Sequence, residues 1–310
     1  MQQMYIVFFQ MAVGLILGFA LRKRGVLDER SEKALSEMLS KAILPFSIIG
    51  SSQYTFSDDV FKGMAGIGVV SVLYYGLSFF TVWKILKKTN IDNDEKRVMT
   101  MTMVFANTGF IGFPMMKTLF GATGLLFAAI YNLSYNLFFF TYGIHIYSKQ
   151  NKFYLKGILF NVVSMASIAS VILFVIPWRM PVFMTETIDV IGNMTAPLSM
   201  IVLGSIFSTV DIKKVFTDYK SFLVAGIRLL VFPAIVLGGL IAAKHYIPIL
   251  PATAGVMLLM TALPSGTLNV IYAEKYNTAP KFATRTVVLS TVLMTVTMPV
   301  FVFLANYFFR

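Results

Sequence analysis

The sequence contains no cysteine and few charged residues. The missing cysteine excludes disulfide bonds, cysteine metal ligands and cysteine nucleophiles, and it leaves the redox compartment undetermined. Charged residues make up 13% of the 310 residues, whereas hydrophobic residues make up 57% and the mean hydropathy is +0.76. These values exclude a soluble protein of two domains. They indicate a polytopic membrane protein surrounded by lipid.

The formal net charge of +12 would suggest a nucleic-acid partner only if it lay on a soluble basic surface. An uneven distribution of basic residues across a membrane explains it better, so no nucleic-acid partner is expected. The first ten residues lack the basic segment that begins a signal peptide. The first apolar run is therefore expected to be a retained helix.

Ten apolar runs are long enough to be membrane-spanning helices. They cover residues 4–21, 34–51, 64–83, 98–120, 125–147, 155–176, 186–207, 221–244, 251–276 and 285–308. The connecting segments are short and leave no room for an inserted soluble domain. The expected fold is an all-α membrane protein with ten transmembrane helices.

Lysine and arginine fall unequally on the two sides of these spans. Nineteen lie at or beyond the ends of the spans on one side, five lie at or beyond the ends on the other, and the remaining two, Lys41 and Arg228, are assigned to the interior of spans. Basic residues favour the cytoplasmic side, so both termini are expected to be non-cytoplasmic in a multi-pass protein of the cell membrane. A missed or added span would abolish this bias, which supports the number ten.

The chain is expected to consist of two repeats, residues 1–150 and 151–310. Pro45 and Ser47 in the second span correspond to Pro197 and Ser199 in the seventh, at an offset of 152 residues. Each repeat has five spans, and an odd number inverts the second repeat relative to the first. Inverted repeats are typical of secondary transporters.

The fourth and ninth spans are each interrupted by glycine and proline. Residues 106–114 read A-N-T-G-F-I-G-F-P, and residues 261–269 read T-A-L-P-S-G-T-L-N. A broken helix at membrane depth is tolerated only where protein or a polar cavity satisfies the freed backbone groups. Paired interruptions in corresponding repeats indicate the binding site of a transporter. The alternative is a pair of proline kinks satisfied by neighbouring helices.

Each interruption is expected to begin a second half-helix. In the fourth span, Pro114 suits the first helical turn, and Gly109 and Gly112 permit backbone turns. In the ninth span, Pro264 ends the first half-helix and Ser265 can cap the second. The N-terminus of each half-helix carries free N–H groups and about +0.5 of partial charge, so the two ends together favour an anion.

Further polar residues could line the same path. Ser47 could contact substrate or bond to its own helix. Asn132, Tyr135 and Asn136 recur at helical spacing, so they share one face of the fifth span. Such a stripe should face protein or water rather than lipid, either as part of a substrate or ion path or as contacts between helices.

Three charged features have simpler interpretations. Arg228 could attract an anion, but extension of its side chain to the cytoplasmic interface is favoured, and Lys41 is interpreted in the same way. The acidic residues 92–95 are interpreted as a solvated loop. No Asp or Glu lies in either interruption, which leaves the coupling ion, proton or sodium, open. No catalytic or metal-binding cluster is found, so an enzyme is not expected.

The residues named for substrate binding come from both repeats. They are Ser47, Asn107, Thr108, Gly109, Gly112, Pro114, Asn132, Tyr135, Asn136, Pro264, Ser265, Gly266 and Asn269. No cofactor is expected.

Several motifs resemble those of the auxin efflux carrier family, which includes the plant PIN auxin exporters and bacterial permeases. They are the interruption at residues 106–114, P-L-S-M-I-V-L-G at 197–204, R-L-L-V-F-P-A at 228–234, L-P-S-G at 263–266 and A-E-K-Y-N at 273–277. The resemblance covers essentially the whole chain. Unlike the plant exporters, the chain has only a short connection between its repeats, and it has Asn193 where the plant pattern tends to have aspartate.

The resemblance implies a fold like that of the bile-acid/sodium symporters and sodium/proton antiporters, with crossed broken helices 4 and 9. Helices 1, 2, 6 and 7 would form a scaffold, helices 3–5 and 8–10 would form a moving transport domain, and helices 2 and 7 would form a homodimer interface. The expected function is secondary active transport, as an efflux carrier or permease, of small organic anions such as auxin-like or dicarboxylate compounds. The substrate would be carried by an elevator-type displacement. A channel or sensor on the same fold is the alternative.

Overall fold

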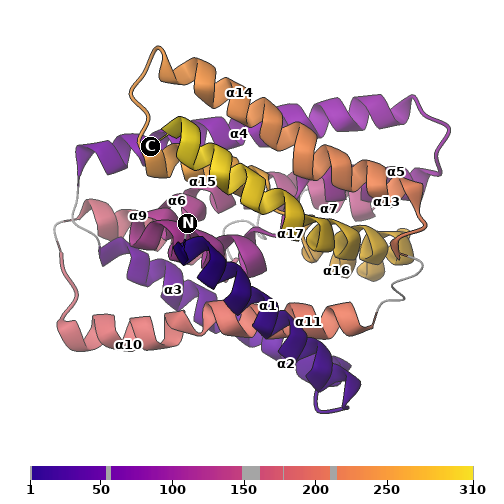
Figure 1. Cartoon of the computed structure of the whole chain (residues 1–310), viewed down its shortest axis with the longest axis horizontal. Helices are drawn as coiled ribbons and strands as arrows, with labels where there is room; N and C mark the ends of the chain where they lie inside the picture. The colour runs from indigo at the N-terminus through magenta and orange to yellow at the C-terminus, as the bar shows by residue number, and fades with distance from the viewer. Residues whose placement is uncertain (1, 54–56, 149–160, 177, 210–214, 310) are drawn as a thin grey trace. The chain divides into compact units, whose positions relative to one another are not determined.

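A computed structural model describes residues 2–53, 57–148, 161–176, 178–209 and 215–309 (Figure 1). Within these ranges every regular element is a helix, and the one bridge between extended segments joins Ala106 to Ser265. The expectation of an all-α fold is therefore confirmed for the part of the chain that the structure describes.

The described residues form two compact units, and each unit draws on both halves of the sequence. The first contains residues from 1–64, 109–130 and 159–210, and the second contains residues from 65–108, 131–158 and 211–310. Helix α6 (Phe113–Phe138) contributes to both.

The first unit is built around closely packed helices. Its helices are α1 (Gln2–Lys23), α2 (Glu29–Met38), α3 (Leu44–Gly50), α9 (Val162–Val175), α10 (Val182–Asn193) and α11 (Thr195–Ser208). Helix α1 crosses α11 (Figure 1), and α10 packs on α3. A Cβ added to Gly18 or Gly204 would lie 2.0 Å from the carbonyl oxygen of Ile201 or Leu15, respectively. The two backbones meet this closely because both positions lack a side chain.

The second unit contains the 30-residue helix α17 and most of the 30-residue helix α4, together with several shorter helices. They are α4 (Asp58–Lys87, from residue 65), α5 (Asn93–Val104), α7 (Ile144–Ser148), α13 (Tyr219–Gly226), α14 (Phe232–Lys244), α15 (Pro251–Thr261), α16 (Leu268–Lys275) and α17 (Pro280–Phe309). Helix α17 packs against α5, α13, α15 and α16. Its contacts join segments that precede and follow the middle of the sequence.

The boundary between the expected fourth and fifth spans lies at Gly121 within α6. The backbone there has φ 65° and ψ −151°, which is not helical. Positive φ values are readily adopted by glycine and rarely by other residues. This position agrees with the expected break between Phe120 and Leu125.

Each of the ten expected ranges contains helix. Five helical segments are long and apolar enough to cross a membrane: Asp58–Lys87, Thr108–Ser148, Val182–Ser208, Tyr219–Lys244 and Pro280–Phe309. The ten crossings and the inverted repeat stay predictions.

The interpretation of residues 92–95 as a loop is wrong. Asp92 caps α5, because its carboxylate accepts hydrogen bonds from the N–H groups of Asp94 and Glu95. Asp94 and Glu95 lie in the first turn of that helix. Acidic side chains favour this position because they satisfy free N–H groups and complement the helix dipole.

Candidate functional site

The two interrupted segments cross within the second unit and pair through their backbones. Helix α5 ends at Val104 and α15 ends at Thr261, and a backbone bridge between Ala106 and Ser265 joins the two non-helical segments that follow. The N–H of Asn107 donates to the carbonyl of Pro264 at 2.8 Å, and the N–H of Gly266 donates to the carbonyl of Phe105 at 2.9 Å. Each interruption thus satisfies backbone groups that the other leaves free, as buried backbone requires.

Gly266 makes this close approach possible. A Cβ at Gly266 would lie 2.6 Å from the carbonyl oxygen of Ala106, whereas a Cβ at Gly109 would meet nothing within 4 Å. Residues Thr108–Gly112 form a π-helical turn, and neither Gly109 nor Gly112 has a positive φ. The interruption therefore does not depend on the conformational freedom expected of Gly109 and Gly112, since a helical backbone does not require glycine.

The expectation that Ser265 caps the second half-helix is also wrong. Its hydroxyl donates to the carbonyl of Thr102 at 2.7 Å, and its N–H donates to the hydroxyl of Ser290 at 3.1 Å. Helix α16 begins at Leu268 and has no side-chain cap. The N-cap position of α16 is Thr267, two residues after Ser265, so the Ser265 side chain does not lie where a capping residue would lie.

Asn269, in the first turn of α16, forms hydrogen bonds that stabilise the crossing. Its side-chain NH₂ donates to the carbonyls of Phe105 and Gly266, each at 3.0 Å. The hydroxyl of Tyr147 donates to its amide oxygen at 3.4 Å. Since an amide NH₂ has two hydrogens, both donors of Asn269 are engaged within the protein.

Arg228 lies fully buried beside the crossing, with none of its surface exposed. Its Nε donates to the carbonyl of Leu263 at 2.9 Å, and Nη2 donates to that of Met260 at 3.4 Å. Its Nη1 donates to the carbonyls of Met103 and Val104 at 3.3 and 3.1 Å, and to the hydroxyl of Tyr74 at 2.6 Å.

The guanidinium therefore joins the C-terminal ends of α5 and α15. Helix C-termini carry unpaired carbonyls and a negative partial charge, which a cation stabilises. The favoured interpretation of Arg228 as an interfacial side chain is wrong, because the planar guanidinium finds five acceptors inside the unit. By contrast, Lys41 is exposed and pairs with Glu37 at 2.7 Å, as an interfacial residue would.

A family model described as membrane transport protein, which represents the auxin efflux carriers, matches residues 1–157 and 148–302. This chain belongs to that family. An uncharacterised transporter of Methanothermobacter thermautotrophicus is 24% identical over 288 residues, which cover 92% of each chain. A second uncharacterised transporter, from Methanocaldococcus jannaschii, is 22% identical over 286 residues, covering 89% of this chain and 90% of the relative.

In this membrane transport protein, the polar stripe of the fifth expected span is buried. Asn132, Tyr135 and Asn136 are at most 4% exposed, as expected for a stripe that faces protein. The hydroxyl of Thr108 donates to the amide oxygen of Asn132 at 2.7 Å, and the ring of Tyr135 lies 5.3 Å from that of Phe105. The first contact connects the stripe to the first interruption, and the second connects it to Phe105, the residue just before that interruption.

The residues expected to bind substrate are divided between the units. Asn107, Thr108, Asn132, Tyr135, Asn136, Pro264, Ser265, Gly266 and Asn269 belong to the second unit, and Ser47, Gly109, Gly112 and Pro114 belong to the first. Ser47 is buried against Gly192 of α10, and Pro114 lies in the first turn of α6, as expected. Substrate contact by the whole set stays a prediction.

Sequence reasoning missed the contacts made by Tyr74, Ser290 and Tyr147. Each lies in a helix far from both interruptions in the sequence, so only the packing of the second unit brings it to the crossing. The one available signal was a basic residue, Arg228, within an otherwise apolar run.

Proposed function

We propose that this protein is a secondary active transporter of small organic anions, such as auxin-like or dicarboxylate compounds. The family and both relatives are transporters. The substrate class rests on the charge at the crossing, and the elevator-type displacement rests on the division into units.

The observation that carries the proposal is the buried cation at the crossing of two broken helices. Arg228 adds one positive charge there, and neither interruption contains an acidic residue. The N-terminus of α16 begins directly after Gly266 and Thr267, and it adds further positive partial charge. Charge of this sign favours an anionic substrate over a cationic one.

Arg228 would act through its field rather than by direct contact. Its donors are engaged by Leu263, Met260, Tyr74 and the end of α5. A substrate carboxylate would instead be held by neutral donors such as Asn107, close to the α16 N-terminus. In a site with few waters this field is screened weakly, so it discriminates strongly by charge.

The two compact units support an elevator-type displacement. All nine residues of the second unit named above lie with Arg228 in one compact body. If this body moved as a whole relative to the first unit, the binding residues would move together. The hydrogen bonds of the crossing would stay intact. The first unit would then act as the scaffold, with a homodimer contact through its second and seventh spans.

The experiment is counterflow in proteoliposomes. Vesicles loaded with an unlabelled anion should accumulate the same labelled anion when the protein is present, for at least one of malate, malonate, succinate and indole-3-acetate. Labelled choline and lysine should not accumulate. Accumulation of the cations, or of no anion across the panel, would contradict the proposal. A flux that shows no counterflow would favour a channel.

Asn107→Ala and Pro264→Ala should lower affinity or turnover by about tenfold while leaving folded protein nearly unchanged. For Asn107→Ala, tenfold corresponds to about 1.4 kcal/mol, the size of one lost hydrogen bond to a charged group. The backbone bridge uses the N–H of Asn107 and the carbonyl of Pro264, which both variants keep. Asn306→Ala, near the end of α17, is the control and should leave flux unchanged. An equal loss of folded protein in the two test variants would make these residues structural.

A further inference from the structure

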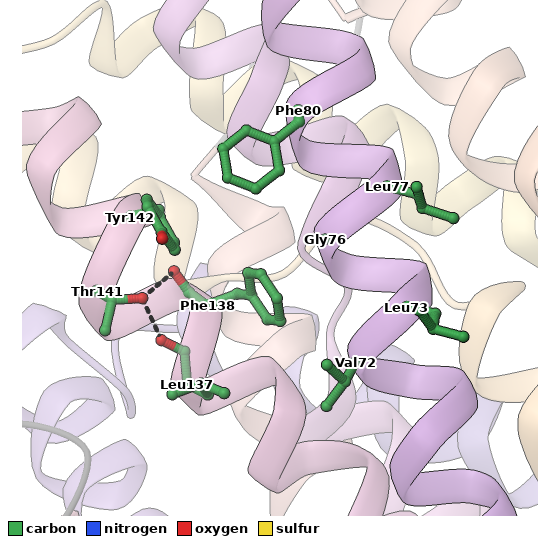
Figure 2. Close-up of a pocket in the computed structure, with 9 residues that line it drawn as sticks. All are labelled: Val72, Leu73, Gly76, Leu77, Phe80, Leu137, Phe138, Thr141 and Tyr142. Carbon is green, nitrogen blue, oxygen red and sulfur yellow. Dashed lines mark hydrogen bonds between the residues drawn. The ribbon is translucent and has the colours of Figure 1, made fainter.

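An apolar groove lies on the second unit between α4 and the helical segment that contains Leu137 and Tyr142 (Figure 2). Its volume is about 560 Å³. The residues that line it are Val72, Leu73, Gly76, Leu77, Phe80, Leu137, Phe138, Thr141 and Tyr142. It is separate from the crossing, and nothing in the proposed transport uses it.

The groove exists because α4 has a glycine at its centre. A Cβ at Gly76 would lie 3.4 Å from the ring of Phe138, and a larger side chain would fill the space. On the same helix Leu73, Leu77 and Phe80 are more than half exposed. Exposed apolar side chains around a hollow of this size provide a surface that an apolar group can contact.

The groove offers an occupant hydrocarbon and aromatic surface but little polarity. The hydroxyl of Thr141 donates to the carbonyls of Leu137 and Phe138, as the dashed lines in Figure 2 show. The ring of Tyr142 packs against Phe80 and Phe138. An acyl chain requires such a surface, whereas a polar ligand would lose its hydrogen bonds to water there.

Basic residues continue the same face of α4 beyond the groove. Leu73, Leu77, Phe80, Lys84 and Lys87 recur at spacings of four and three, so they form one stripe along the helix. From Leu73 to Lys84 the helix rises ~16 Å, about half the thickness of the hydrocarbon core of a bilayer. One acyl chain of a leaflet therefore spans the distance from the lysines to the far end of the groove.

Lys84 and Lys87 are exposed, and among the described residues neither forms an ion pair. The ammonium of Lys87 lies 5.1 Å from the ring of Trp83. Tryptophan and lysine together are typical of the interface between membrane and water. The distribution of basic residues predicts that this end of α4 lies on the cytoplasmic side. The cytoplasmic leaflet is rich in anionic lipids.

We propose that the groove is a binding site for one anionic phospholipid. One acyl chain lies between α4 and the Leu137–Tyr142 segment, beside Gly76, and the phosphate lies between Lys84 and Lys87. The apolar groove determines where the chain lies, and the two lysines determine the charge of the headgroup.

The test is lipid binding to the purified full-length protein in detergent, measured by native mass spectrometry and by the shift in melting temperature. The probes are dioleoylphosphatidylglycerol and dioleoylphosphatidylcholine. The phosphatidylglycerol should bind at least tenfold more tightly and raise the melting temperature more. Equal binding of the two lipids would overturn the proposal. Competition by glycerol phosphate alone would also overturn it, because that result would assign the site to free phosphate.

Matched variants separate the two parts of the site. Lys84→Gln with Lys87→Gln should reduce phosphatidylglycerol binding to the level of phosphatidylcholine, whereas Lys62→Gln at the other end of α4 should not. Gly76→Leu should abolish tight binding of both lipids, whereas Gly66→Leu should not, since a Cβ at Gly66 meets nothing within 4 Å. Equal effects of test and control variants would overturn the proposal. A dimer that dissociates in Gly76→Leu would overturn it in favour of a second copy of the chain.

Discussion

At the residue scale, the basic side chains of Lys41 and Arg228 both lie in apolar runs, but they differ in exposure and in hydrogen bonding. Lys41 keeps its ammonium exposed and pairs with Glu37, whereas Arg228 is enclosed and bonded to four carbonyls and a hydroxyl. The difference arises from the ends of α5 and α15, which present acceptors to one residue and not to the other.

Arg228→Met should therefore destabilise the protein by about 3 kcal/mol or more, since the carbonyls it satisfies would remain buried without partners. Lys41→Met should cost less than about 1 kcal/mol, as expected for an exposed pair. Denaturant unfolding of the purified protein in detergent would measure both. A similar loss of unfolding free energy in the two variants would contradict the buried position of Arg228 and favour an interfacial side chain.

Gly266→Ala should cost about 1–3 kcal/mol, because its Cβ would overlap the carbonyl oxygen of Ala106. Gly109→Ala lies in the other interruption with open space around it, and it should change stability by less than about 1 kcal/mol. Melting temperatures of the two variants provide the comparison. If Gly109→Ala were the more damaging, the crossing would depend on a different contact.

At the element scale, the contact of α1 with α11 depends on two glycines from opposite ends of the first unit's sequence. A Cβ at Gly204 would lie 2.0 Å from the carbonyl oxygen of Leu15. Backbone atoms cannot rotate away as a flexible side chain can, so the helices would have to separate.

Gly204→Ala should therefore lower the melting temperature and the yield of monodisperse protein. Gly226→Ala is the control, since its Cβ meets nothing within 4 Å and alanine favours helix by up to about 1 kcal/mol over glycine. Size-exclusion chromatography and thermal unfolding would measure the two effects. Equal behaviour would show that α1 and α11 tolerate a wider spacing.

At the scale of the whole molecule, the absence of cysteine makes the orientation directly measurable. Asn90 follows α4, and Tyr246 follows α14 and is 88% exposed. The distribution of basic residues predicts that Asn90 lies in the cytoplasm and that Tyr246 lies outside. In intact cells a membrane-impermeant maleimide should label Tyr246→Cys and spare Asn90→Cys until the membrane is opened. The reverse pattern would invert the topology, and labelling of both would contradict the count of spans.

The interruptions themselves were predictable, but their partners were not. Proline and glycine within an apolar run disfavour a continuous helix by local stereochemistry, so residues 106–114 and 261–269 were found from the sequence. The cap expected at Ser265 was also inferred from neighbouring residues in the sequence alone. It was wrong because α16 begins at Leu268, so Thr267 rather than Ser265 lies at its N-cap position, and the Ser265 hydroxyl instead donates to the carbonyl of Thr102.

The sequence by itself determined the class of protein, the helical segments, the two interruptions and the uneven distribution of charge, because these follow from composition and from contacts within a few residues. Only the tertiary structure decided which residues hold the crossing. Arg228, Gly266 and Asn269 owe their roles to backbone carbonyls of segments distant from them in sequence. The free energy of a buried hydrogen bond depends on the partner that packing supplies, and a linear pattern of residues does not contain that partner.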